Sequence, residues 1–262
     1  NFAMKVAKDG YPELAKKYLD KDNIKADPNK EGRNKVLGEI ELQLARSSPD
    51  LKTRKEHIKK ASEYFKGTKQ TALEAAAFSF SLANQIKMGL KEPGLSAAEK
   101  ASIASEVIPY FEEAKTQYKA YLDANKETFE KFMERLMGEE RPPFQTTKEG
   151  KAGIESIYSP YVIAEMRYFE CIVEKANLLP KGDASRCTGL DKVVDEADAF
   201  GYLVEAPVPT ATIAVYVARI HGVMAECGVD AKGSLEKANE KFKEVLAFEK
   251  PSNSGDARII RD

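Results

Sequence analysis

Tyrosine, glutamate and arginine side chains recur at helical spacing in the second half of the sequence, where they could bind a protein or peptide. Tyr161, Glu165 and Tyr168 are four and three residues apart, which places them on one face of a helix. Tyrosine and arginine are over-represented in the hot spots of protein interfaces. The candidate partner-binding residues are Tyr158, Tyr161, Glu165, Tyr168, Tyr216 and Arg219. The simpler interpretation is that the tyrosines pack on a neighbouring helix, and the sharper one is a groove that receives a peptide or helix.

The same tyrosines lie close in sequence to glutamates that could act as a general acid or base. Glu155, Glu165 and Glu170 are the candidates for this role. Aspartate and glutamate together number 42, so the presence of a carboxylate does not by itself single out a catalytic residue. A deep pocket around a glutamate with a raised pKa would favour an enzyme, whereas a shallow open groove would favour a binding protein.

Three cysteines and two histidines limit the metal and redox chemistry that the chain can support. The cysteines are scattered and form no Cys-x-x-Cys pair, so they do not make a zinc site. Cys171 and Cys187 flank a turn at 180–182 at comparable distances, and an antiparallel hairpin would bring them level. The sequence therefore allows a disulfide between them, provided that their Cα atoms approach to about 6 Å. Cys227 is expected to be a buried structural thiol, because cysteine is among the most buried residue types.

No common phosphate or metal motif is present, so the sequence predicts neither a cofactor nor a metal. The patterns GxGxxG, GxxxxGK[ST] and HExxH are absent. A calcium-loop pattern begins at Asp123 and ends at Glu134, but Thr128 stands where such a loop requires glycine. Lysine and arginine number 41 against 42 acidic residues, and this near-neutral balance argues against a dedicated nucleic-acid-binding protein. No apolar run approaches the roughly 20 residues that span a bilayer.

The elements that must position these side chains are helices. Apolar residues recur with the 3.6-residue period of an α-helix, and no segment alternates convincingly as a strand would. The clearest apolar stripes run along 103–122, 162–176 and 213–227, and each must be buried against a neighbouring element. Helices are predicted at 2–8, 12–21, 31–47, 51–66, 70–88, 96–123, 126–138, 147–178, 183–204, 208–226 and 231–248.

Proline, glycine and aspartate separate these helices by short links. Pro142 and Pro143 make the firmest interior break, because two prolines forbid helix. Asp50 follows another break, where it can cap the next helix. Short links place consecutive helices antiparallel, so we expect an all-α chain made of helical hairpins that stack as a solenoid. We expect this solenoid to be a single domain over 1–262, with a sub-boundary near 139–146.

A small alanine followed one turn later by a large residue recurs through the chain. Ala15, Ala61, Ala114 and Ala238 are followed four residues on by leucine, phenylalanine, tyrosine and phenylalanine. The sequences DGYPELAKKYL at 9–19 and GSLEKANEKF at 233–242 match the glycine, alanine and large residue that open the second helix of a tetratricopeptide (TPR) repeat. The chain therefore resembles TPR proteins, and its unequal spacing is similar to the irregular TPR-like arrays of large bacterial proteins. The resemblance implies a right-handed superhelical solenoid of antiparallel hairpins.

The same resemblance implies a non-catalytic scaffold for protein–protein interaction. In such a scaffold, the first helices of successive hairpins form a concave surface that receives a protein or peptide partner. Two alternatives stay open. One is a structural spacer within a longer polypeptide, which is favoured because both ends of the sequence look truncated. The other is an all-α enzyme that uses glutamate and tyrosine. The first residue is Asn1 rather than methionine, and together with the resemblance this favours an exported or periplasmic protein over a cytoplasmic one.

Overall fold

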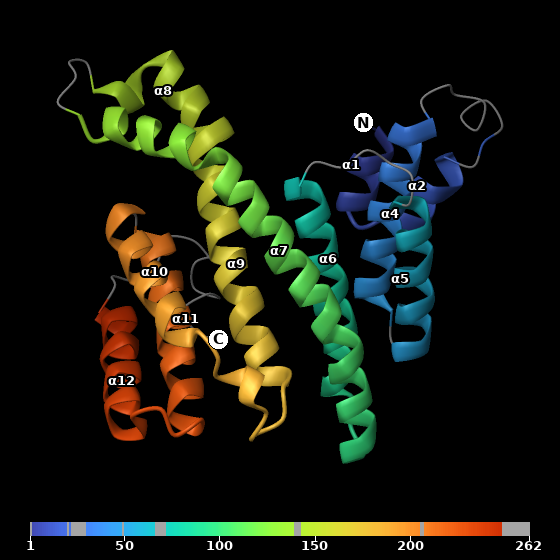
Figure 1. The fold of residues 1–262 in the computed structure, drawn as a ribbon. Coiled ribbons are helices and arrows are strands. Elements are labelled where there is room, and N and C mark those ends of the chain that lie inside the picture. Colours follow the sequence, from blue (N-terminus) through green and yellow to red (C-terminus); the bar gives the residue numbers. More distant parts are fainter. Residues whose placement is uncertain are drawn as a thin grey trace. The chain divides into compact units, whose positions relative to one another are not determined.

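Every regular element in the part of the chain that the structure describes is a helix, which confirms the predicted all-α class (Figure 1). The computed structural model describes residues 2–19, 21, 30–48, 50–65, 72–138, 143–204 and 207–247. The chain divides into two compact units, Asn1–Tyr110 and Phe111–Asp262. Their boundary falls within one long helix, α7 (Ala97–Leu136). The sub-boundary expected near 139–146 lies partly outside the described residues.

The described residues of the first unit form a set of helices. It contains α1 (Phe2–Lys8), α2 (Pro12–Leu19), α4 (Lys30–Ser47), α5 (Leu51–Phe65), α6 (Ala72–Lys87), the 3-10 turn η1 (Met88–Lys91) and the beginning of α7. Gly10 has a φ of +95°, which lets the chain reverse between α1 and α2. The amide of Tyr11 then donates to the carbonyl of Val6 at 3.1 Å, which closes the end of α1. Buried alanine, valine, leucine and isoleucine side chains of α1, α2 and α4 form a common core.

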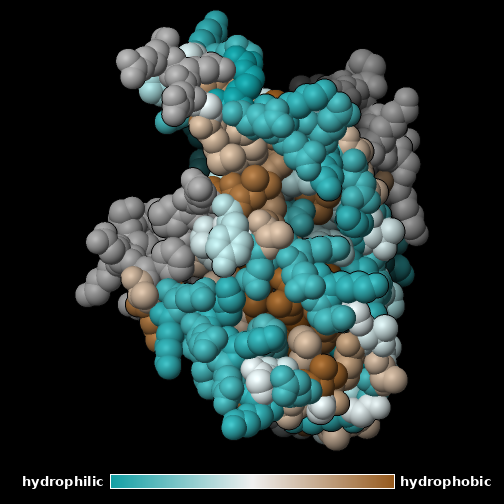
Figure 2. Space-filling model, turned by 60° about the vertical axis from the view of Figure 1, so that its left-hand side comes forward, coloured by the Kyte–Doolittle hydropathy of each residue, from teal (hydrophilic) through white to brown (hydrophobic). Residues whose placement is uncertain are grey.

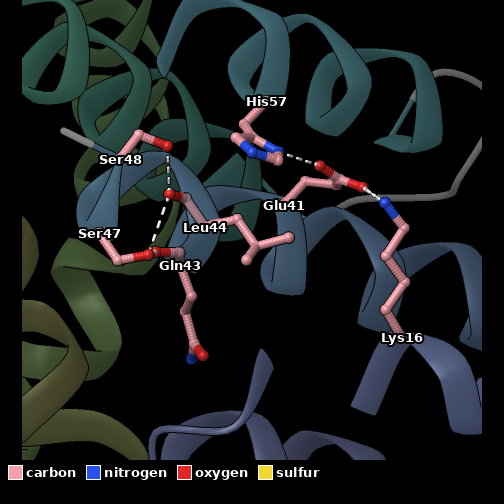
Figure 3. Close-up of polar contacts among 7 residues, drawn as sticks. All are labelled: Lys16, Glu41, Gln43, Leu44, Ser47, Ser48 and His57. Atoms are coloured by element: carbon pink, nitrogen blue, oxygen red, sulfur yellow. Dashed lines mark hydrogen bonds and ion pairs between the residues drawn. The ribbon is translucent and has the colours of Figure 1, made fainter. Parts of the chain in front are cut away.

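A buried carboxylate joins three helices of the first unit (Figure 3). The side chain of Glu41 on α4 is 0% exposed, and its Oε1 lies 2.5 Å from Nζ of Lys16 on α2. Its Oε2 lies 2.7 Å from Nδ1 of His57 on α5. Burial alone would lower the pKa of Lys16, but the hydrogen bond and the charge of Glu41 raise it, so the lysine stays charged. A carboxylate removed from water needs such partners, and these two tie α2 and α5 to α4.

The long helix α7 replaces two helices that the sequence predicts as separate, at 96–123 and 126–138. It starts at a capping box, in which the amide of Glu99 donates to Oγ of Ser96 at 3.2 Å and the amide of Ser96 donates to Oε2 of Glu99 at 2.8 Å. Asp123 is paired with a lysine one turn away, at 2.8 Å, where a link was expected. The helix also continues through Pro109. The pattern from Asp123 to Glu134 is therefore helical and does not form a calcium-type loop.

The second unit contains the rest of α7 and the helices that carry most of the predicted site. These are η2 (Phe144–Thr146), α8 (Lys148–Gly153), the π-helical turn η3 (Ile154–Tyr158), α9 (Ser159–Leu178), η4 (Ala184–Arg186), α10 (Leu190–Val204), α11 (Pro207–Glu226) and α12 (Ala231–Ala247). Pro160 stands in the first turn of α9, where its missing amide hydrogen costs nothing. Helix α11 packs against α9, α10 and α12, and these helices lie beside one another in Figure 1.

The predicted apolar stripes form much of the core. Along 103–122 the apolar stripe is buried, with Val107, Phe111 and Ala114 at 0% exposure. The stripe of α9 is buried through Phe169 and Val173, and that of α11 is buried through Ile213 and Val217. A search of the described residues for a helix with the length and apolar character of a membrane span found none.

Candidate partner-binding groove

Two of the predicted binding tyrosines are packed inside the second unit. The ring of Tyr161 on α9 stacks on Phe129 of α7, with ring centroids 4.0 Å apart and planes at 8°. Only 8% of Tyr161 is exposed. The hydroxyl of Tyr158 donates to the carbonyl of Val204 at the end of α10 at 3.2 Å. Both rings hold α9 against its neighbours, which matches the simpler of the two interpretations made from their spacing.

Glu165 and Tyr168 continue along the same face of α9, toward α7 and α10. Burial raises the pKa of Glu165 from 4.5 to about 7; the charge of Lys119 on α7 opposes this rise, and that of Glu196 on α10 adds to it. Burial also raises the pKa of Tyr168, and the nearby Glu196 adds to this effect. Glu165 is therefore a half-buried acid between three helices. Glu165 lines neither of the two hollows described below on the opposite face of α9.

The two remaining predicted residues, Tyr216 and Arg219, lie on α11 and meet the opposite face of α9. The hydroxyl of Tyr216 donates to Oε2 of Glu170 at 3.1 Å. Nη2 of Arg219 donates to Oε1 of Glu174 at 2.9 Å. Burial and the negative charge of Glu170 raise the pKa of Tyr216, so its hydroxyl keeps the proton that it donates. Arg167 forms a further ion pair with Glu170.

These contacts show that α9 and α11 run parallel. Glu170 meets a residue 46 positions later, and Glu174 meets one 45 positions later, so both helices advance in the same direction. Helix α10, which lies between them in sequence, returns the chain. Helices α9 and α11 are thus neighbours although they are not consecutive in the chain.

Two hollows open between these parallel helices, and we call them together the α9–α11 groove. The smaller has a volume of about 260 Å³ and is lined by Met166, Arg167, Glu170, Thr212, Val215, Tyr216 and Arg219. The larger has a volume of about 640 Å³ and is lined by Asn177, Lys181, Arg186, Arg219, Gly222, Val223, Ala225, Glu226 and Leu235. Arg219 lines both hollows, so the two are continuous at its side chain.

Arg186 is the most firmly held cation of the larger hollow. It is 6% exposed, and its Nε donates to the carbonyl of Ala176, near the end of α9, at 2.8 Å. Its Nη2 forms an ion pair with Glu226, which also lies 3.5 Å from Nζ of Lys181. The bond to Ala176 satisfies one of the last carbonyls of α9, so Arg186 caps that helix as well as lining the hollow.

A disulfide links the segment after α9 to the end of α11 beside the larger hollow, and its pairing differs from the one considered from the sequence. Cys187 is bonded to Cys227, with their Cα atoms 6.1 Å apart, whereas Cys171 is a buried free thiol. The expected pairing of Cys171 with Cys187 is wrong, and so is the expectation of a free thiol at Cys227. The turn η4 keeps Cys187 out of α10, which begins only at Leu190, so the cysteine does not face Cys171 across a hairpin. Burial raises the pKa of Cys171, which keeps it protonated.

Hydrophobicity does not mark the groove. The face of the molecule in Figure 2 is mostly hydrophilic, with apolar residues reaching the surface in patches. The most exposed large apolar residues among those described are Tyr202 at 80% and Leu246 at 76%, and neither lines the groove. Scattered exposed apolar residues are ordinary. The groove is distinguished instead by its ion pairs.

The sequence analysis did not predict that Lys181 and Arg186 line the larger hollow of the groove. Lys181 and Arg186 lie in the link after α9, and Glu226 is the last residue of α11. No local spacing connects positions 40 residues apart, although each of Arg186 and Glu226 directly precedes a cysteine of the disulfide. Glu170 also directly precedes a cysteine, the free Cys171, so this pattern does not single out the linked pair.

Comparisons with protein-family models, with curated proteins and with solved structures found no match. The resemblance to TPR proteins therefore remains a prediction from the sequence motifs. Each alanine of those motifs is buried, from 0% exposure at Ala15, Ala61 and Ala114 to 6% at Ala238. Burial is what close helix packing at a small residue requires.

Proposed function

We propose that the chain is a non-catalytic scaffold for protein–protein interaction, built as a TPR-like solenoid of helical hairpins. The observation that carries the proposal is the α9–α11 groove, which two neighbouring parallel helices line with tyrosine, arginine and glutamate side chains. A protein or peptide segment lying along this groove would meet Tyr216 and Arg219, residue types that dominate interface energetics.

A similar arrangement in the first unit supports the proposal. Helices α4 and α6 also run parallel, because Lys35 meets Glu74 at 3.4 Å and Arg46 meets Ser81 at 3.2 Å. A hollow of about 410 Å³ lies between them, and Phe65 and other residues of α4 and α6 line it. Hollows between parallel helices in both units are what stacked hairpins would produce.

The mechanism that we propose is presentation of a preformed surface. The ion pairs of Glu170, Glu174 and Glu226 hold the groove side chains in place before a partner arrives. A partner then docks with little change in the backbone, as preorganised interfaces usually do. Fixing side chains in advance reduces the entropy that binding would otherwise cost, about 0.5–1.5 kcal/mol for each flexible side chain.

A photocrosslinking experiment tests this function. A photoreactive phenylalanine replaces Met166, which lines the groove, or Asp195, an exposed residue of α10 outside it. After irradiation in an extract of the source organism, the proposal expects one protein to be linked from position 166 and not from 195. The substitution Arg219→Glu in the same chain should abolish that link. The same products from both positions, or a link that survives Arg219→Glu, would show that the groove is not the binding surface.

The two alternatives drawn from the sequence, an enzyme and a spacer, have less structural support than the scaffold. The enzyme alternative has one supporting observation, the raised pKa of Glu165, which is about 7 and would suit a general acid. Its carboxyl is packed toward α7 and α10 rather than the α9–α11 groove. The spacer alternative draws on no feature of the fold. Export stays part of our proposal, because a disulfide such as Cys187–Cys227 persists mainly in oxidising compartments.

A further inference from the structure

The larger hollow of the groove carries more positive than negative charge. Lys181, Arg186 and Arg219 line it, against the single carboxylate of Glu226. Glu226 is already shared between Arg186 and Lys181, and Arg219 is held from outside the lining by Glu174. Two of the cations are arginines, whose planar guanidinium can hold a carboxylate by two parallel hydrogen bonds.

One of these cations is built into the wall. Arg186 is more than nine-tenths buried, and its guanidinium is fixed by the carbonyl of Ala176 and the carboxylate of Glu226. The next residue, Cys187, is tied by the disulfide to Cys227, which directly follows Glu226. Both members of the ion pair are therefore anchored through their chain neighbours. A buried and anchored guanidinium differs from the solvated surface cations elsewhere on the chain.

Apart from the amide of Asn177, the rest of the lining is apolar. Val223 and Ala225 contribute small side chains from α11, and Leu235 on α12 is 53% exposed. The volume of about 640 Å³ falls within the range of ordinary ligand sites. A ligand that suits both the cationic and the apolar residues of the lining has a carboxylate close to an aliphatic group.

We infer that the larger hollow binds an acidic polypeptide segment of the partner, with carboxylates on Arg186, Arg219 and Lys181 and an aliphatic side chain against Leu235. This inference rests on the proposed function and adds to it the chemistry of the partner. Charge complementarity argues for it, because the three cations outnumber the two carboxylates, Glu226 and Glu174, that pair with them.

Fluorescence anisotropy with two peptide probes tests the inference on the full chain. The first probe is a fluorescein-labelled peptide of alternating glutamate and leucine, and the second has glutamine in place of each glutamate. We expect the acidic probe to bind at least about 10-fold more tightly than the neutral one, since a hydrogen bond to a charged group contributes about 1.5–3 kcal/mol. The affinity should fall as salt is added.

Matched charge-removing variants locate the binding. Arg219→Gln should weaken binding of the acidic probe by about 10-fold. Lys181→Gln should weaken it by about 3-fold, as expected for an exposed ion pair; this lysine is 81% exposed, so its loss leaves the fold intact. Lys192→Gln, at an exposed position of α10 outside the groove, should leave the affinity unchanged.

Three results would overturn the inference. These are equal affinity for the two probes, affinity that neither groove variant changes, and displacement of the acidic probe by an equal concentration of inorganic phosphate, which would indicate a phosphate site instead. Failure of the peptide tests together with a groove-specific photocrosslink would reject the acidic partner but keep the scaffold. Failure of both would reject the scaffold as well.

Discussion

Replacing Glu165 by glutamine should stabilise the protein, and the gain should depend on pH. Burial between α7, α9 and α10 raises the pKa of this carboxyl from 4.5 to about 7 in the folded chain. The unfolded chain therefore releases the proton near pH 4.5, whereas the folded chain keeps it until near pH 7. Between these values the folded state binds more protons, so the stability of the wild-type protein falls as the pH rises. Above about pH 7 the whole penalty is present.

The size of the effect follows from the shift. Each pKa unit corresponds to about 1.4 kcal/mol, so a rise to about 7 would cost about 3 kcal/mol at pH 8. The side chain keeps some contact with solvent, and screening reduces this figure to about 1–2 kcal/mol. At pH 5 most unfolded chains have already released this proton, but the accumulated cost is still below about 1 kcal/mol, and screening reduces it to a few tenths of a kcal/mol. Glutamine keeps the shape of glutamate and cannot ionise.

Urea denaturation at pH 5 and pH 8, followed by circular dichroism, measures the difference. Glu165→Gln should raise the free energy of unfolding by about 1–2 kcal/mol at pH 8 and by only a few tenths at pH 5. Glu240→Gln, on the exposed face of α12, serves as the control and should change neither value appreciably. A gain of equal size at both pH values, or a loss of stability at pH 8, would refute the argument that Glu165 is held in its neutral form by burial.

Three further changes should each lower stability. Glu41→Gln removes the buried carboxylate that contacts Lys16 and His57 in the first unit and should cost about 2–4 kcal/mol in urea denaturation. Reducing the Cys187–Cys227 disulfide, which closes a loop of 40 residues, should lower the free energy of unfolding by about 3–4 kcal/mol, and a peptide map without reductant should show this linkage. Gly153→Ala would place a Cβ 2.2 Å from a ring carbon of Phe132, and the resulting overpacking should lower the midpoint of thermal unfolding by an amount equivalent to about 1–3 kcal/mol.

Helix positions were predictable because local chemistry sets them. The helix expected at 51–66 is observed at Leu51–Phe65, and Asp50 caps it by accepting a hydrogen bond from the amide of Thr53 at 2.9 Å. The helix expected at 208–226 is observed at Pro207–Glu226. The false break inside α7 has an equally local cause. Polar residues around Asp123 resemble a link, but they form ion pairs along the helix, which turns them into a solvated helical face.

The placement of the candidate binding residues was only half predictable, because helical spacing identifies a face without identifying what covers it. Tyr161, Glu165 and Tyr168 do share a face of α9, and Tyr158 precedes it at the end of η3, yet α7 and α10 pack against these residues. The partners of α9 in the groove come from 45 and 46 residues later in the chain. Such a separation depends on the lengths of α10 and its links, which the apolar pattern gives only to within a few residues.

The disulfide error and the missed cations have the same origin, and together they indicate what organises the groove. The chain between α9 and α10 was read as a plain turn, but it holds the 3-10 turn η4, which directs Arg186 and Cys187 toward the end of α11. The covalent bond and the ion pair with Glu226 then act on adjacent residues. An ion pair open to solvent contributes little by itself, since its side chains lose entropy when they are held. Here the disulfide already restrains the backbone on both sides, so the binding of an acidic segment that we propose would cost less entropy.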